Sequence, residues 1–105
     1  MQNIFEMHAE ICKVLSNPTR LRILNMLRNK EMSVTELMEA AKLSQANISQ
    51  HLAIMKHKGI VTSNRRGKHI YYSITNHKII KAFDIMREVL IEKIQETKLV
   101  SKLRT

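Results

Sequence analysis

A run of short polar side chains near the middle of the chain has the chemistry to read the edges of nucleic-acid bases. These side chains carry amide, hydroxyl and imidazole groups, and they belong to Gln45, Asn47, Ser49, Gln50 and His51. Ile48, Leu52 and Met55 recur among them at spacings of four and three, which places these three on one face of a helix. The opposite face then presents hydrogen-bond donors and acceptors at its N-terminal end, as a helix in a major groove does.

Cations follow this polar run at two places. Arg65, Arg66 and Lys68 surround Gly67, which places three positive charges within four residues of a turn. Lys56 and Lys58 come at the far end of the same expected helix, where they could hold phosphates. Ser44 precedes the helix, and its hydroxyl and the unpaired N–H groups of the first turn can bind another phosphate. Phosphate contacts position a protein on a duplex, whereas base contacts specify the sequence.

The charge of the chain is concentrated in one block. The net charge of the 105 residues is +9, but residues 1–40 carry five basic and five acidic residues. Residues 41–81 carry eight basic residues and no acidic one, and residues 82–105 are nearly balanced. A solvated surface normally mixes its signs. An acid-free block of this length indicates a surface that meets a polyanion.

The elements that must position these residues are mostly helical, since the chain has only two glycines and one proline. Apolar spacing and capping residues predict helices over 4–15, 18–29, 34–41 and 45–58, and a last helix from about residue 76 to well past residue 90. Ser33 and Glu36 form a capping box, and Gly59 suits a left-handed helix stop. Residues 61–66 and 69–74 are predicted strands of a hairpin.

This order predicts a mostly α fold with a small β-hairpin, in the order α-α-α-α-β-β-α. Two short helices joined by a tight turn and followed by a basic hairpin make a winged helix-turn-helix. We expect one domain over residues 1–98 and a frayed tail over residues 99–105. The last helix carries an apolar stripe that is too wide for one packing surface, which indicates that one side faces a second chain.

Three segments resemble the ArsR/SmtB family of repressors. They are the stretches over 17–24 (NPTRLRIL), 43–52 (LSQANISQHL) and 67–74 (GKHIYYSI), and the resemblance covers residues 9–95. It implies a homodimer through the first and last helices that binds a double-stranded DNA operator, an imperfect palindrome, until an effector releases it. The candidate interface residues are Ile4, Ile11, Met86, Val89 and Leu90.

The chain departs from the family at the positions that hold metals in many relatives. Ser33 and Thr35 stand where those relatives have two cysteines, and hydroxyls do not replace thiolates for soft metals. Of the carboxylate and histidine pairs that others carry on the last helix, only Glu92 remains. We therefore expect no metal and no cofactor. His8 and Cys12, four residues apart on the first helix, leave a redox-responsive or metal-responsive regulator as an alternative.

Other classes of protein fit the sequence less well. There is no nucleophile elbow, Gly-rich phosphate loop or H-E-x-x-H motif, so we do not expect an enzyme. An RNA-binding or protein-interaction module of the same fold remains an alternative, although only Tyr71 and Tyr72 could stack bases on the hairpin. A single cysteine and the lack of an apolar segment of membrane-spanning length favour a cytoplasmic protein without a membrane partner.

Overall fold

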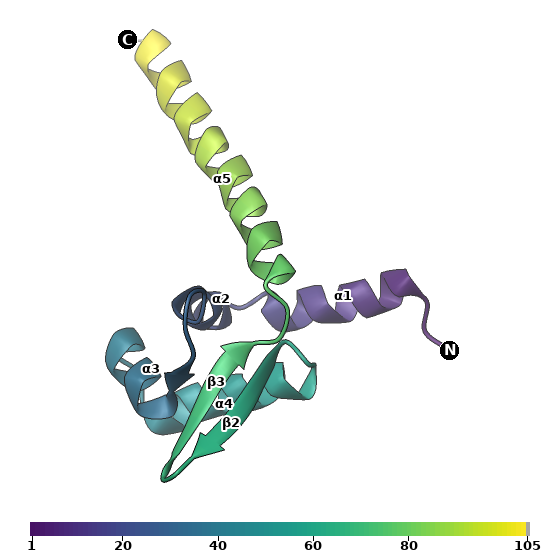
Figure 1. The fold of residues 1–105 in the computed structure, drawn as a ribbon. Coiled ribbons are helices and arrows are strands. Elements are labelled where there is room, and N and C mark those ends of the chain that lie inside the picture. The colour runs from purple at the N-terminus through teal and green to yellow at the C-terminus, as the bar shows by residue number, and fades with distance from the viewer. Residues whose placement is uncertain (105) are drawn as a thin grey trace.

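The computed structural model describes residues 1–104 and has five helices and three short strands in that range (Figure 1). The elements follow in the order α1 (Ile4–Leu15), α2 (Pro18–Met26), β1 (Met32–Ser33), α3 (Val34–Ala41), α4 (Gln45–His57), β2 (Val61–Arg66), β3 (His69–Ile74) and α5 (Lys78–Leu103). This is the predicted helix and strand order with one strand added. The predicted mostly α, winged helix-turn-helix fold is confirmed.

The first four helices begin at side chains that accept a hydrogen bond from a backbone N–H of the first turn. Asn3, Asn17, Ser33 and Ser44 occupy these N-cap positions. Each accepts from the residue three positions on, and so satisfies one of the helix's unpaired donors. At α3 the Glu36 carboxylate also accepts from the Ser33 N–H, which completes the predicted capping box. That backbone hydrogen bond is the main reason that the pKa of Glu36 lies below its usual value.

Left-handed backbone turns end two of these helices. Lys42 has a φ of 57° directly after α3, and its N–H donates to Met38 O at 2.8 Å. Gly59 has a φ of +75° after α4, a conformation that glycine adopts without strain, so the predicted helix stop is confirmed. The prediction for α2 was wrong at its end. This helix stops at Met26, not Asn29, because Leu27 already acts as its C-cap.

A three-stranded antiparallel sheet in the order β1-β3-β2 replaces the two-stranded hairpin of the prediction. β2 and β3 pair from Val61 with Ile74 to Arg66 with His69. β1 adds the pairs Met32 with Tyr72 and Ser33 with Tyr71. The added strand joins the segment before α3 to the hairpin, so the helix-turn-helix and the wing belong to one sheet-backed unit.

The hydrophobic core lies among α2, α3, α4 and the sheet. Its side chains that are almost completely buried are Ile23, Leu24, Leu27, Leu37, Ile48, Leu52, Met55 and Val61. Burying a side chain of this size contributes about 1.5–3 kcal/mol. Three of the eight come from α4, so the core fixes the rotation of that helix.

Helix α5 behaves differently, because most of it extends away from the rest of the domain (Figure 1). Ile80 is its only buried residue among those described, and Ile79 and Phe83 pack against the core from the same end. The helix continues through residues 99–103, past the domain boundary at 98 that the sequence predicts. That boundary, and the frayed tail over 99–105, stay predictions, and residue 105 lies outside the described residues.

Candidate nucleic-acid interface

Helix α4 divides into a buried apolar face and an exposed polar face. Ile48, Leu52 and Met55 are each 0% exposed, as the spacing in the sequence predicts. Opposite them lie the exposed Gln45, Asn47 and Gln50 and the half-buried Ser49, and none of these four side chains hydrogen-bonds to another described residue. Ser44 Oγ caps the helix and accepts from Asn47 N at 3.2 Å. The start of α4 therefore presents polar groups without partners inside the protein.

His51 lies at the edge of this polar face and differs from its neighbours. Its ring is half-buried, and Nδ1 accepts a hydrogen bond from Arg20 Nε at 3.1 Å. Burial, and after it the charge of Arg20, lowers the pKa of His51. Arg20 Nη1 also donates to Val14 O at 2.8 Å, so one guanidinium links the end of α1, helix α2 and α4. The DNA contact that the sequence predicts for His51 stays a prediction. No sequence pattern indicates its hydrogen bond with Arg20.

The hairpin carries its two arginines in different environments. Arg65 is exposed and makes no side-chain hydrogen bond or ion pair within residues 1–104. Arg66 forms an ion pair with Glu31, in the segment before β1, and its guanidinium lies 4.0 Å from the centre of the Tyr71 ring. Gly67, with a φ of +62°, turns the chain at the tip, and Lys68 follows it, exposed. Arg65 and Lys68 thus leave their charges unpaired at the tip, whereas Arg66 is held against the domain.

The two lysines at the end of α4 also have partners. Lys56 Nζ donates to Ser63 Oγ on β2 at 2.6 Å, which ties the helix to the hairpin. Lys58 Nζ lies 3.6 Å from Glu10 Oε2 on α1. Exposed pairs of this kind contribute little to stability, so both charges remain available to a stronger anion.

The arrangement of these groups favours a single contact surface. In Figure 1 the hairpin tip and α4 lie at the end of the molecule away from the distal part of α5. Acidic residues are absent from 41–81, and Glu31, the partner of Arg66, lies outside that block. The surface can donate hydrogen bonds to bases from α4 and offer positive charge to phosphates from the tip.

The predicted interface residues on α1 and α5 are mostly exposed in the single chain. Ile4 is 68% exposed, Met86 59%, and Val89 and Leu90 52% each. Ile11 is half-buried and packs in part against the chain's own core. Large apolar side chains exposed in this way are typical of a surface that another protein covers.

The weak metal candidates do not gather ligands around them. His8 and Cys12 are both exposed on α1. Within residues 1–104 no three histidine, cysteine, aspartate or glutamate side chains lie close enough together to hold a metal ion. In the same range no helix is long and apolar enough to cross a membrane.

Part of the chain is similar in sequence to known bacterial proteins. Residues 17–63, from the N-cap of α2 into β2, match the family described as bacterial regulatory protein, arsR family. The transcriptional repressor PagR of Bacillus anthracis is 43% identical over 72 residues, which are 68% of this chain and 72% of that protein. The chain belongs to the ArsR family.

Solved structures of similar proteins agree with the fold over most of the chain. The crystal structure of Rv0081 from Mycobacterium tuberculosis superposes with a TM-score of 0.80 and 31% identity, covering 91% of this chain and 97% of that one. The winged helix-turn-helix domain of Mb0332 from Mycobacterium bovis is described as homodimeric. It superposes with a TM-score of 0.79 and 27% identity, covering 89% of this chain and 86% of that one. The predicted family is confirmed, and this ArsR protein is a DNA-binding transcriptional regulator; the family consists of regulators and not of enzymes.

Proposed function

We propose that this ArsR protein is a cytoplasmic, homodimeric repressor that binds an imperfectly palindromic operator. In each protomer α4 enters a major groove, and the hairpin tip contacts the adjacent backbone or minor groove. The two half-sites lie about one helical turn, roughly 34 Å, apart. The bound dimer blocks transcription, as the name of the relative PagR describes for that protein.

One observation carries this proposal. Gln45, Asn47 and Gln50 at the start of α4 are exposed and lack side-chain partners within residues 1–104, although the opposite face of the same helix is completely buried. The buried face fixes the helix rotation, so the orientation of the polar face is set before any ligand arrives. Preorganised donors and acceptors of this kind suit base edges, where a bidentate contact discriminates by about 1–3 kcal/mol.

The proposed roles follow from the surroundings of each side chain. Gln45, Asn47, Ser49 and Gln50 read bases, and His51 supports them through Arg20 or adds a contact of its own. Ser44 and the N–H groups at the helix start bind a phosphate. The phosphate contacts of the flanks come from Lys56, Arg65, Arg66 and Lys68.

The dimer is supported by the exposed apolar groups of α1 and α5. A single chain would leave Ile4, Met86, Val89 and Leu90 more than half exposed, whereas a second copy would cover them. The homodimeric description of Mb0332 supports the same assembly. An effector that changes the angle between the protomers would misplace both α4 helices together and release the operator.

The experiment that tests the proposal compares three variants on two duplexes. A fragment from upstream of the protein's own gene and a scrambled fragment of equal length are titrated by fluorescence anisotropy at several salt concentrations. Gln45→Ala and Asn47→Ala should lose affinity for the upstream fragment by about 1–3 kcal/mol and change little on the scrambled one. Arg65→Gln should weaken binding to both fragments and reduce the salt slope by about one unit.

Lys98→Gln, on the distal part of α5, serves as the matched control for loss of positive charge. It should behave like the parent protein on both duplexes. If each of the three interface variants lost as much affinity for the scrambled fragment as for the upstream fragment, α4 would not recognise a specific DNA sequence. If the parent protein retained neither fragment in dilute salt, the proposed function would be wrong.

A further inference from the structure

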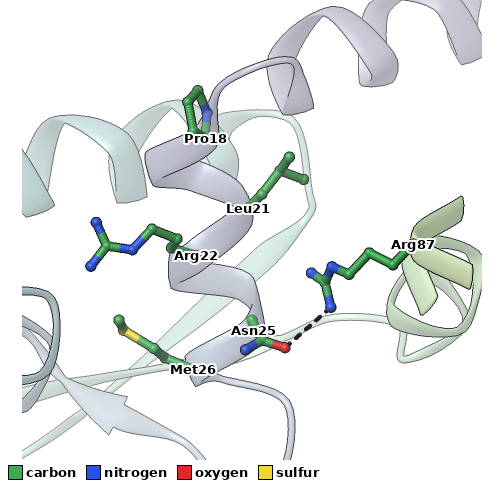
Figure 2. Close-up of a pocket in the computed structure, with 6 residues that line it drawn as sticks. All are labelled: Pro18, Leu21, Arg22, Asn25, Met26 and Arg87. Atoms are coloured by element: carbon green, nitrogen blue, oxygen red, sulfur yellow. Dashed lines mark hydrogen bonds between the residues drawn. The ribbon is translucent and has the colours of Figure 1, made fainter. Parts of the chain in front are cut away.

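A cleft of about 520 Å³ opens between α2 and α5, and none of its lining residues belongs to α4 or to the hairpin (Figure 2). The walls combine apolar side chains with two guanidinium groups and an amide. The lining residues are Pro18, Leu21, Arg22, Asn25, Met26 and Arg87. The DNA-binding proposal gives this cleft no role.

Positive charge on the α5 side of the cleft is only partly neutralised. Arg28 donates to both carboxylate oxygens of Asp84, at 2.6 and 2.9 Å, and to Asn25 Oδ1 at 3.0 and 3.2 Å. Arg87 contacts the same two residues at longer distances: its Nη1 lies 3.4 Å from Asn25 Oδ1 and 3.5 Å from Asp84 Oδ1. One carboxylate therefore faces two guanidinium groups, and the one that lines the cleft has the weaker contacts.

The α2 side adds donors and an apolar wall. Arg22 makes one contact within the described chain, a long hydrogen bond of 3.4 Å to Ala41 O, and it points away from Arg87 across α2 in Figure 2. The Asn25 amide nitrogen donates to no described residue. Leu21 is half-buried and gives the Arg87 side of the cleft its apolar surface, whereas Met26 points to the same side of α2 as Arg22 in Figure 2. An inorganic anion would pair with the charges but leave this surface uncovered.

We propose that the cleft binds a small organic carboxylate. Its oxyanion pairs with Arg87, whose planar guanidinium can donate two parallel hydrogen bonds. Its apolar part covers Leu21. A bound molecule of this class would bridge α2 to α5, the helix that carries most of the expected dimer contacts.

This bridge provides a route to the recognition helix. Arg20, which lies between the cleft residues Pro18 and Leu21 on α2, donates a hydrogen bond to His51 Nδ1 of α4 at 3.1 Å. A ligand that shifts α5 against α2 would therefore alter both the protomer angle and the support of α4. This regulatory consequence rests on the proposed repressor function, whereas binding of the carboxylate does not.

The binding test uses sodium hexanoate as the probe, with hexanamide and inorganic phosphate as matched comparisons. The backbone amides and the arginine Nε–H groups of the ¹⁵N-labelled full chain are followed by NMR during each titration. Hexanoate should give saturable shifts at Arg87 Nε–H and at the Leu21 and Asn25 backbone amides. Hexanamide and phosphate should bind at least about tenfold more weakly, since each lacks one half of the recognised chemistry. Equal binding of either one, or shifts centred elsewhere, would overturn the proposal.

Variants separate the cleft from nonspecific effects of charge. Arg87→Gln should weaken hexanoate binding at least about tenfold. Arg87→Lys should bind hexanoate with an affinity between those of the parent chain and Arg87→Gln, because it keeps the positive charge but loses the two parallel donors of the guanidinium. Lys98→Gln, also on α5, should bind like the parent chain. An unchanged dissociation constant in folded Arg87→Gln would overturn the site.

The regulatory step is read from DNA binding by the parent protein. Saturating hexanoate should change its affinity for the upstream fragment about tenfold and leave Arg87→Gln unaffected. Saturable binding at Arg87 without any change in DNA affinity would overturn the regulatory role alone. Failure of the parent protein to bind DNA without hexanoate would instead contradict the repressor function, and the NMR result would stand.

Discussion

Helices α4 and α5 show two ways in which a helix is fixed in this fold. α4 has three completely buried residues in 13, and its exposed N-terminal face is polar. α5 has one buried residue in the 26 described, and its exposed side is rich in isoleucine, leucine and valine. The difference indicates that α4 is positioned by its own chain, whereas most of α5 needs a second chain to cover it.

The largest expected effect comes from removing a buried side chain of α4. Leu52→Ala should lower the free energy of unfolding by about 2–5 kcal/mol, because Leu52 is 0% exposed and its loss leaves a cavity. Leu90→Ala on α5, which is 52% exposed, is the matched comparison. Its loss of stability should depend on protein concentration, as expected for a contact between chains. Chemical unfolding at two protein concentrations measures both, and equal, concentration-independent losses would erase the distinction.

Charge on the exposed face of α5 should separate the chains without unfolding them. Val89→Glu with Leu90→Glu should give a folded monomer in sedimentation experiments, since the two glutamates cannot be desolvated at an apolar interface. Affinity for the operator should fall about 100-fold or more because one recognition helix no longer assists the other. A matched pair on the opposite side of α5, Lys98→Glu with Lys102→Glu, should remain dimeric. A double glutamate variant that stayed dimeric would place the interface elsewhere.

The two arginines of the hairpin should contribute unequally to DNA binding. Arg65→Gln should reduce the salt slope by about one unit, and Arg66→Gln by less, because Glu31 already neutralises Arg66 in the unbound protein. Glu31→Gln removes that competing carboxylate and should raise the affinity for duplexes of any sequence. Salt titrations of the three variants measure these slopes. Equal slopes for the two arginine variants would show that the ion pair with Glu31 does not persist in solution.

The smallest expected effect is a pH dependence that comes from α4. The pKa of His51 is lowered in the folded chain, mainly by burial and then by Arg20, so the unfolded chain binds this proton more readily. Stability should therefore be unaffected above the ordinary histidine pKa of about 6.5 and should fall as the pH drops from there toward the folded pKa. Unfolding measured from pH 7.5 to 5 against His51→Gln isolates this contribution. A His51→Gln variant with the same pH profile would show that another group causes the dependence.

The elements that the sequence predicts well are those with local signals. α3 and both hairpin strands have the predicted bounds because a capping box, a left-handed turn and alternating residues mark them within a few positions. The sequence also predicts the polar and apolar faces of α4, because Ile48, Leu52 and Met55 recur at helical spacing and all three are buried. Local hydrogen bonding and side-chain periodicity act over such short distances that one sequence suffices.

The features that the sequence did not reveal depend on residues far apart in the chain. β1 is two residues long, so it has no periodicity, and it exists only because Tyr71 and Tyr72 pair with it. The partners of His51 and Arg66 lie 31 and 35 residues away. The end of α2 was missed because Leu27 continues the apolar pattern while serving as the C-cap and packing in the core.

Hydroxyl-radical footprinting of the upstream fragment tests the central proposal most directly, namely that two copies of α4 and the hairpin tip contact one duplex. Two protected patches are expected, with their centres about one helical turn apart, and both should be lost in Val89→Glu with Leu90→Glu. A single patch that is unchanged in that variant, or no protection in dilute salt, would contradict it.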